Sequence, residues 1–198
     1  MKKVYNFKTF NLLESYLNKQ DISIEDFIKA INIDENIDNI VTYWNENYSD
    51  IEIYYFDFDN GFLGVNIGDG KIAINKNFKG GMFPPSMGVN IFKLFILFHE
   101  LRHNIQRKEG MDEGNDLYFN FVKNDNKEDF LKWYIKLEKD ANDYAINTIE
   151  KLGFDLSSMD KMYLRGNEKG GNMIFKFMKS DIEKYNVSNF YDLIKKQI

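Results

Sequence analysis

The sequence predicts an α+β fold in which a small antiparallel sheet of about three strands packs against two long helices. Residues 51–75 contain three short runs rich in β-branched and aromatic side chains, separated by turns that contain glycine. Residues 89–107 and 128–152 instead carry apolar side chains at helical spacing. The chain has 198 residues, of which 43% are hydrophobic, so it can form a buried core. We therefore expect a single domain over residues 1–198.

Residues 1–50 are predicted to form a helical N-terminal segment. One helix of this segment is expected to begin at Ser23, because Ser23-Ile24-Glu25-Asp26 is a capping-box pattern that precedes apolar residues at helical spacing. The expected role of this segment is to pack against the core.

The core segment, residues 51–153, begins with the predicted strands. These strands are residues 51–58, 62–67 and 71–75. The sequences Asp59-Asn60-Gly61 and Gly68-Asp69-Gly70 separate them, and both are typical of hairpin turns. Consecutive hairpins form an antiparallel meander, which is therefore the predicted sheet topology.

Two long helices are predicted after the sheet. A Gly/Pro stretch at residues 80–85 ends the sheet, and the first helix runs from residue 89 to residue 107, stopping near Gly110. Residues 115–127 are predicted to be a polar loop. The second helix, residues 128–152, ends at Gly153. Residues 154–198 are predicted to form a helical C-terminal segment with two further short helices.

Charge, cysteine content and hydropathy exclude several classes of function. With 26 basic and 31 acidic residues, the net charge is −5, which offers no basic surface for a nucleic-acid backbone. The absence of cysteine excludes thiolate metal sites and cysteine nucleophiles. Residues 1–17 lack an apolar signal-peptide core, and the most apolar stretch, residues 91–98, is far shorter than the roughly 20 residues that span a bilayer. We expect a cytoplasmic or virion-associated protein without nucleic-acid or membrane partners, and of undetermined oligomeric state.

The first long helix contains the only two histidines of the chain, in the pattern His99-Glu100-Leu101-Arg102-His103. Chance would produce this HExxH pattern with a probability on the order of one in a thousand. Residues four apart lie one helical turn apart, so both imidazoles can bind one tetrahedral metal ion. Glu100 then lies beside the metal and can take a proton from a metal-bound water. We predict one Zn²⁺ per chain, with His99 and His103 as ligands.

A zinc site of this kind needs a third protein ligand. The chain has no other histidine and no cysteine, so the ligand must be a carboxylate or a tyrosine. Glu138 is the strongest candidate, because it lies in the apolar stripe of the second long helix, whereas Asp140 and Asp143 are predicted to turn away from that stripe. Alternatively, Glu138 is a boundary residue that reaches water or a lysine. Four acidic residues after the first helix are rival ligands, although they more simply form a solvated acidic loop: Glu109, Asp112, Glu113 and Asp116.

These two helices resemble those of gluzincin metallopeptidases, in which HExxH is joined by a downstream glutamate on a second helix. The resemblance is in particular to ImmA/IrrE-type and related small phage or mobile-element peptidases. In those families a strand similar to residues 71–75 precedes HExxH, and a Glu-x-x-Ala-Asn/Asp-x-Phe/Tyr-Ala signature follows it. Here the signature reads Glu138-Lys139-Asp140-Ala141-Asn142-Asp143-Tyr144-Ala145. The resemblance implies a zincin-like fold, Glu138 as the third ligand, and Asn142 as a support for the site.

The function predicted from the sequence is that of a zinc-dependent metallopeptidase acting on a peptide or protein substrate. A metal-activated water would hydrolyse the peptide bond, with Glu100 as general base. The strand at residues 71–75 is a candidate edge for substrate binding, or equally an interior strand. Tyr163 or Arg165 is a candidate oxyanion donor, although both are more often surface or packing residues. The alternative is a noncatalytic, zinc-stabilised interaction or structural module, for example of a phage or a regulatory system. A third interpretation is a chance motif in a metal-free helical protein.

Overall fold

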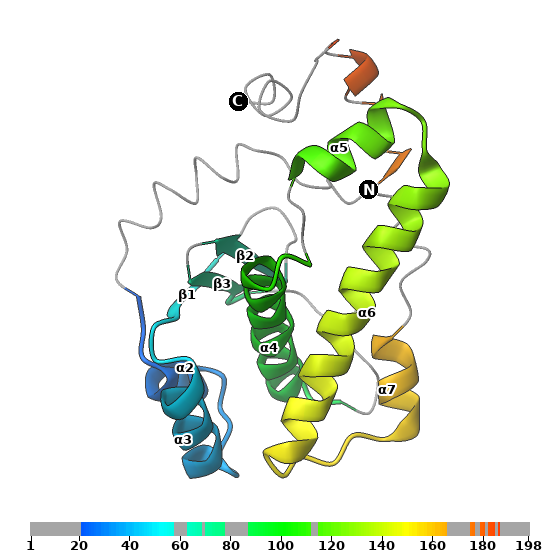
Figure 1. Cartoon of the computed structure of the whole chain (residues 1–198). Coiled ribbons are helices and arrows are strands. Elements are labelled where there is room, and N and C mark those ends of the chain that lie inside the picture. Colours follow the sequence, from blue (N-terminus) through cyan, green and yellow to red (C-terminus); the bar gives the residue numbers. More distant parts are fainter. Residues whose placement is uncertain are drawn as a thin grey trace. The chain divides into compact units, whose positions relative to one another are not determined.

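The computed structural model describes residues 21–57, 63–68, 70–77, 87–111 and 115–165, together with residues 175, 176, 179, 180, 182–184 and 186. Its helices are α2 (Ile24–Ala30), α3 (Ile37–Asn47), α4 (Val89–Lys108), α5 (Asn115–Lys123), α6 (Lys127–Lys151) and α7 (Ser158–Leu164), and its strands are β1 (Glu52–Phe56), β2 (Gly64–Gly68) and β3 (Lys71–Asn75) (Figure 1). The α+β class and the three strands are confirmed. The predictions for residues 1–20, for the Gly/Pro stretch and for most of the chain after residue 165 lie outside the described residues.

The chain divides into two compact units, each built from separate stretches of sequence. One unit contains the stretch Lys19–Ile105, with α2, α3, the sheet and most of α4, and the stretch Asp140–Arg165, with the second half of α6 and α7. The other unit contains Gln106–Lys139 and the described residues from 175 onward. Helices α4 and α6 each continue from one unit into the other.

The sheet is mixed, so the predicted antiparallel meander is wrong. The strand order is β1-β3-β2; β1 runs parallel to β3, with Ile53 opposite Ile72, and β2 runs antiparallel to β3. A parallel pair needs a crossover connection, and here β2 itself lies in that connection. The chain leaves β1, forms β2 at the far edge, and returns through Gly70, with φ +77°, into the central strand β3.

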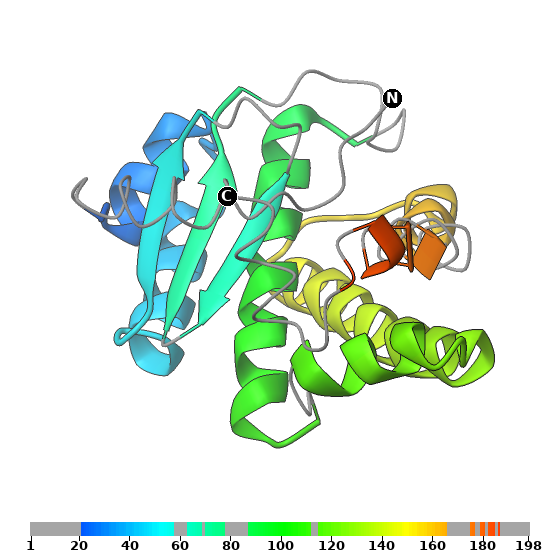
Figure 2. The ribbon, with the colours of Figure 1, turned by 90° about the horizontal axis from the view of Figure 1, so that it is seen from above.

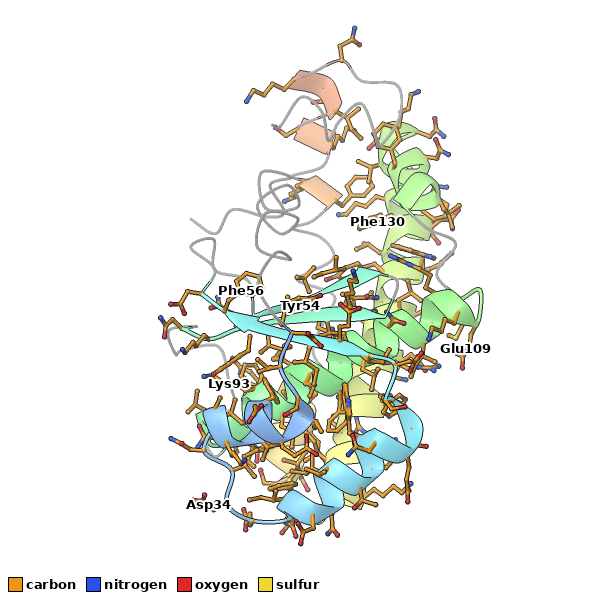
Figure 3. All side chains as sticks on the ribbon, turned by 90° about the vertical axis from the view of Figure 1, so that its left-hand side faces the viewer. Asp34, Tyr54, Phe56, Lys93, Glu109 and Phe130 are labelled. Carbon is orange, nitrogen blue, oxygen red and sulfur yellow. The ribbon has the colours of Figure 1, made fainter. Side chains whose placement is uncertain are left out.

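One face of the sheet packs against helices of the same unit. Ile53 of β1 and both isoleucines of β3, Ile72 and Ile74, belong to one buried cluster with residues of α2, α3 and α4. Figure 3 shows these three helices on the same side of the sheet. Tyr54 and Phe56, on the opposite face, are also buried. Because β1 and β3 are largely buried on both faces, their sequences are nearly continuous apolar runs.

The two long helices begin and end close to their predicted limits. Helix α4 covers 20 residues and α6 covers 25 residues. Gly110 and Gly153, which follow them, have φ values of +71° and +99°, the left-handed conformation in which glycine commonly ends a helix. Helix α2 begins as predicted, with the Ser23 side chain accepting a hydrogen bond from the Asp26 amide at 3.0 Å. Within the described residues, no helix is both long and apolar enough to cross a membrane.

The predicted polar loop at residues 115–127 is wrong, because α5 occupies most of it. Phe119 and Val122 lie three residues apart on α5 and are buried with Phe130 of α6 and Phe175. Most residues of this stretch are polar, so its few apolar residues are not obvious in the sequence. When the helix forms, these apolar residues lie together on one narrow face. This aromatic cluster is the described core of the second unit.

Strand β2 lies so close to α4 that Gly64 has no room for a side chain (Figure 2). An added β-carbon would lie 2.5 Å from Ile96 Cγ2 and 3.0 Å from Glu100 Cγ. We expect Gly64→Ala to lower the free energy of unfolding by about 1–3 kcal/mol, because overpacking pushes the two elements apart. Gly88→Ala is the matched control, since its β-carbon would meet no atom within 4 Å, and it should change stability by at most about 0.5 kcal/mol. Urea unfolding measures both values, and equal effects would contradict the tight packing.

Candidate metal centre

Helix α4 brings the imidazoles of His99 and His103 together. Both side chains are half-buried, their Nε2 atoms lie 3.0 Å apart, and their rings are nearly perpendicular, at 86°. Two nitrogen ligands about 2.0–2.1 Å from one tetrahedral zinc ion are roughly 3.3 Å apart. The two ring nitrogens therefore have nearly the separation that a shared zinc ion requires.

Asn142 of α6 determines which nitrogen of His99 carries the proton. Its Oδ1 lies 2.8 Å from His99 Nδ1, and a carbonyl oxygen can only accept a hydrogen bond. His99 must therefore donate from Nδ1, so its Nε2 carries the lone pair that can bind a metal. The amide of Asn142 is 4% exposed, so this contact is shielded from water. The support that the resemblance implied for Asn142 thus has a direct structural counterpart.

The surroundings of His99 also keep its ring neutral. Burial, and secondly the neighbouring His103, lower the pKa of His99 from 6.5 to about 3, while the hydrogen bond with Asn142 acts in the opposite direction. A neutral imidazole is the form that binds a metal. His99 is therefore ready to act as a ligand at neutral pH without first losing a proton.

Glu138 lies on α6 one helical turn before Asn142, and so on nearly the same face of that helix. One ligand atom each from Glu138, His99 and His103 lie within 4.8 Å of one another, and all three residues are half-buried. Across the described residues, this is the one group of three or more histidine, aspartate or glutamate side chains that could hold a metal ion. Two nitrogens and one carboxylate oxygen form a donor set that suits zinc.

The rival ligands from the acidic stretch do not join this group within the described residues. Glu109 is exposed just beyond the end of α4. Asp112 and Glu113 lie outside the described residues, as does the side chain of Asp116. Glu138 is therefore the carboxylate that the described structure brings to the two histidines.

Glu100 follows His99 on α4 and contacts strand β2. The main-chain amide of Asn66 donates a hydrogen bond to Glu100 Oε2 at 2.8 Å. The side chain of Asn66 accepts one from Asn104 Nδ2 at 3.3 Å, and Asn104 is buried on α4. The strand thus holds one oxygen of the carboxylate in a fixed position.

Two contacts between α4 and α6 were not predicted from the sequence. Asp140 was expected to turn away, but its Oδ2 accepts a hydrogen bond from Arg102 Nε at 2.6 Å. Gln106 is fully buried, and its Nε2 donates to the carbonyl oxygen of Leu137 at 2.9 Å. The apolar stripe indicates only the centre of a helix contact, whereas long polar side chains also reach partners at its margin. The Arg102–Asp140 contact could have been predicted from the position of Arg102 in a largely apolar helix, because a buried cation needs a carboxylate partner.

The two candidate oxyanion donors lie at the end of α7. Arg165 donates from Nε to Asp143 Oδ1 of α6 at 2.6 Å, so its charge is paired there. Tyr163 is 49% exposed. These positions give no support for a role of either residue beside the histidines.

We expect Asn142→Leu to weaken the binding of added zinc by about 10–100-fold, because His99 would lose the acceptor that fixes its tautomer and ring orientation. Asn142→Asp keeps an oxygen at the same place and should bind zinc within a few-fold of the wild-type affinity. Competition with a chromophoric chelator measures both affinities. Unchanged zinc binding by the leucine variant would show that this contact does not support the site.

Comparisons of the chain with family models, curated proteins and solved structures find no match. The functional argument therefore rests on the geometry of α4, α6 and β2 and on the chemistry of their side chains.

Proposed function

We propose that the chain is a zinc-dependent peptidase of the gluzincin type, with a zincin-like arrangement of its sheet and long helices. His99, His103 and Glu138 would hold one zinc ion, and Glu100 would act as general base. The substrate would be a peptide or a protein segment in an extended conformation.

The observation that carries the proposal is the grouping of three ligand atoms within 4.8 Å. Glu100, which directly follows His99 in the chain, is not needed as a ligand. A purely structural zinc site is usually closed by four protein ligands, whereas a catalytic site has three and keeps one position open. Three protein donors, together with a glutamate that follows His99 on α4, fit the catalytic pattern. This is also why a catalytic role is favoured over a noncatalytic zinc module.

In the proposed hydrolysis the zinc ion, Glu100 and Asn142 would have different roles. A bound zinc ion would polarise the scissile carbonyl and lower the pKa of a water molecule. Glu100 would take the proton of the attacking water and deliver it to the nitrogen of the leaving amine. Because the Asn66 amide binds Oε2 of Glu100, the other carboxylate oxygen would be the one that handles the proton. Asn142 would hold His99 in its ligand form throughout.

Strand β2 is the proposed docking edge for an extended substrate, in place of the strand expected from the sequence. Strand β3 is central, with β1 on one side and β2 on the other, so its main-chain groups are already paired. In this sheet β1 and β2 are the two edge strands, and β1 also forms an isolated bridge with Ile22. An extended peptide could add to the other side of β2 by main-chain hydrogen bonds, which depend little on the sequence of the substrate.

The proposal is tested by two measurements on the full-length chain. Inductively coupled plasma mass spectrometry should find about one zinc ion per chain after zinc is supplied and excess metal removed. Incubation of that protein with a library of unstructured peptides should yield fragments with new amino termini, detected by mass spectrometry, and a chelator should stop their formation. Absence of bound metal would overturn the whole proposal. Bound zinc without cleavage of any peptide or denatured protein would favour the noncatalytic module.

A further inference from the structure

Arg102, which lies inside the HExxH sequence, is held by two residues of α6. Its Nε donates to Asp140 Oδ2 at 2.6 Å, and its guanidinium carbon lies 5.6 Å from the centre of the Tyr144 ring. The arginine side chain is only 14% exposed. Asp140 and Tyr144 are four residues apart, so two successive turns of α6 contact the same cation.

The ring of Tyr144 is itself fixed from the side of α3. Its hydroxyl is hydrogen-bonded to the hydroxyl of Tyr48, the C-terminal cap of α3, and lies 3.5 Å from the hydroxyl of Tyr43. Burial raises the pKa of Tyr48 to about 12 and also raises the pKa of Tyr144, so both hydroxyls remain protonated and able to donate at neutral pH. Arg102 is therefore stacked against a ring that cannot easily move away.

These contacts lie one helical turn from the contact that orients His99. His99 is three residues before Arg102 on α4, and its partner Asn142 is two residues after Asp140 on α6. Glu138 is two residues before Asp140 on the same helix. A shift of α6 by one residue moves its side chains by about 1.5 Å along the axis, whereas metal–ligand distances tolerate only about 0.2 Å.

We propose that Arg102 is a positioning residue, which through Asp140 and Tyr144 keeps α6 in the register that Asn142 and Glu138 need to serve the zinc site. This inference rests on the proposed function, because it requires zinc at His99, His103 and Glu138. Arg102 does not bind the metal in this scheme. It acts by holding α6, which carries the proposed ligand Glu138 and also Asn142, the hydrogen-bond partner of His99.

The test compares Arg102→Met with Arg165→Met in the full-length chain. Arg165 is a matched control, because its Nε also lies 2.6 Å from an aspartate of α6, Asp143, but it lies beyond α7 rather than on α4. We expect Arg102→Met to weaken zinc binding by about 10-fold or more and Arg165→Met to leave it within about two-fold. Asp140→Asn should weaken binding as Arg102→Met does, and the double variant should be no weaker than either single variant.

The visible absorption spectrum of bound cobalt(II) distinguishes a change in ligand positions from a general loss of protein stability. Cobalt(II) bound in place of zinc reports ligand geometry through its visible absorption bands, which a merely less stable but correctly folded chain would not alter. At saturating cobalt, the bands should shift in Arg102→Met and Asp140→Asn but not in Arg165→Met. If Arg102→Met does not fold, Arg102→Lys, which keeps the charge but loses the planar guanidinium, is judged by the same criteria.

The outcomes distinguish the two proposals. A wild-type chain that binds neither zinc nor cobalt would overturn the proposed function and this inference with it. A wild-type chain that binds metal, with equal affinities and spectra for Arg102→Met and Arg165→Met, would overturn the positioning role alone. Weaker zinc binding and shifted cobalt bands confined to the Arg102 and Asp140 variants would support it.

Discussion

Glu100→Gln should reduce peptide hydrolysis by about 10²–10⁴-fold while leaving zinc content unchanged. Glutamine has nearly the same shape as glutamate, and its side-chain oxygen can still accept the hydrogen bond from the Asn66 amide. It cannot take a proton from water, however, so the proposed general base would be lost. Because Glu100 is not among the three proposed ligands, the metal should remain bound.

The rate of cleavage of a peptide found in the library measures this effect, with zinc content determined on the same samples. Glu109→Gln is the control, since Glu109 is exposed just beyond α4 and should leave the rate unchanged. A Glu100→Gln variant that cleaves at the wild-type rate would exclude Glu100 as the base. If zinc were lost together with activity, Glu100 would instead contribute to metal binding.

Glu138→Ala should weaken zinc binding by at least about 100-fold, more than the loss of a residue that only supports a ligand. The variant would keep two of three protein ligands, and a two-histidine site on one helix holds zinc poorly because more positions must be filled by water. Zinc content after gel filtration should fall from about one ion per chain to a small fraction of that value. Chelator competition gives the change in affinity.

Glu150→Ala provides the matched control for this experiment. Glu150 also lies on α6, is half-buried, and forms an ion pair with Lys161 of α7 rather than joining the histidines. It should retain full zinc binding. If both alanine variants kept one zinc ion per chain, the third ligand would have to be sought elsewhere, beginning with the acidic residues after α4.

The sequence allowed the helices that carry the proposed ligands to be predicted closely, because their signals are local. His99 and His103 lie one turn apart wherever a helix forms, and Glu138 follows the apolar period of α6. Glycines at 110 and 153 mark the helix ends for a conformational reason that needs no tertiary information. These features depend on residues near one another in the chain.

The sheet topology could not be obtained in the same way. The turn-like sequence Asp59-Asn60-Gly61 suggests a hairpin between the first two strands, but β1 pairs instead with β3. Which strand becomes central depends on packing against α2, α3 and α4, and not on the turns alone. The contact of Asp140 was missed for a related reason: at 100° per residue Asp140 lies about 120° from the centre of the apolar stripe, yet Arg102 is long enough to reach it.

The hydrogen bond from the Asn66 amide to Glu100 has a consequence for the association of chains. An edge strand with open amides is a template for pairing with another molecule, and here Glu100 covers one of them. Replacing Glu100 by alanine would uncover that amide, whereas glutamine would keep it covered. We expect the alanine variant to self-associate more readily in light scattering at high protein concentration, so glutamine is the better substitution for an inactive form.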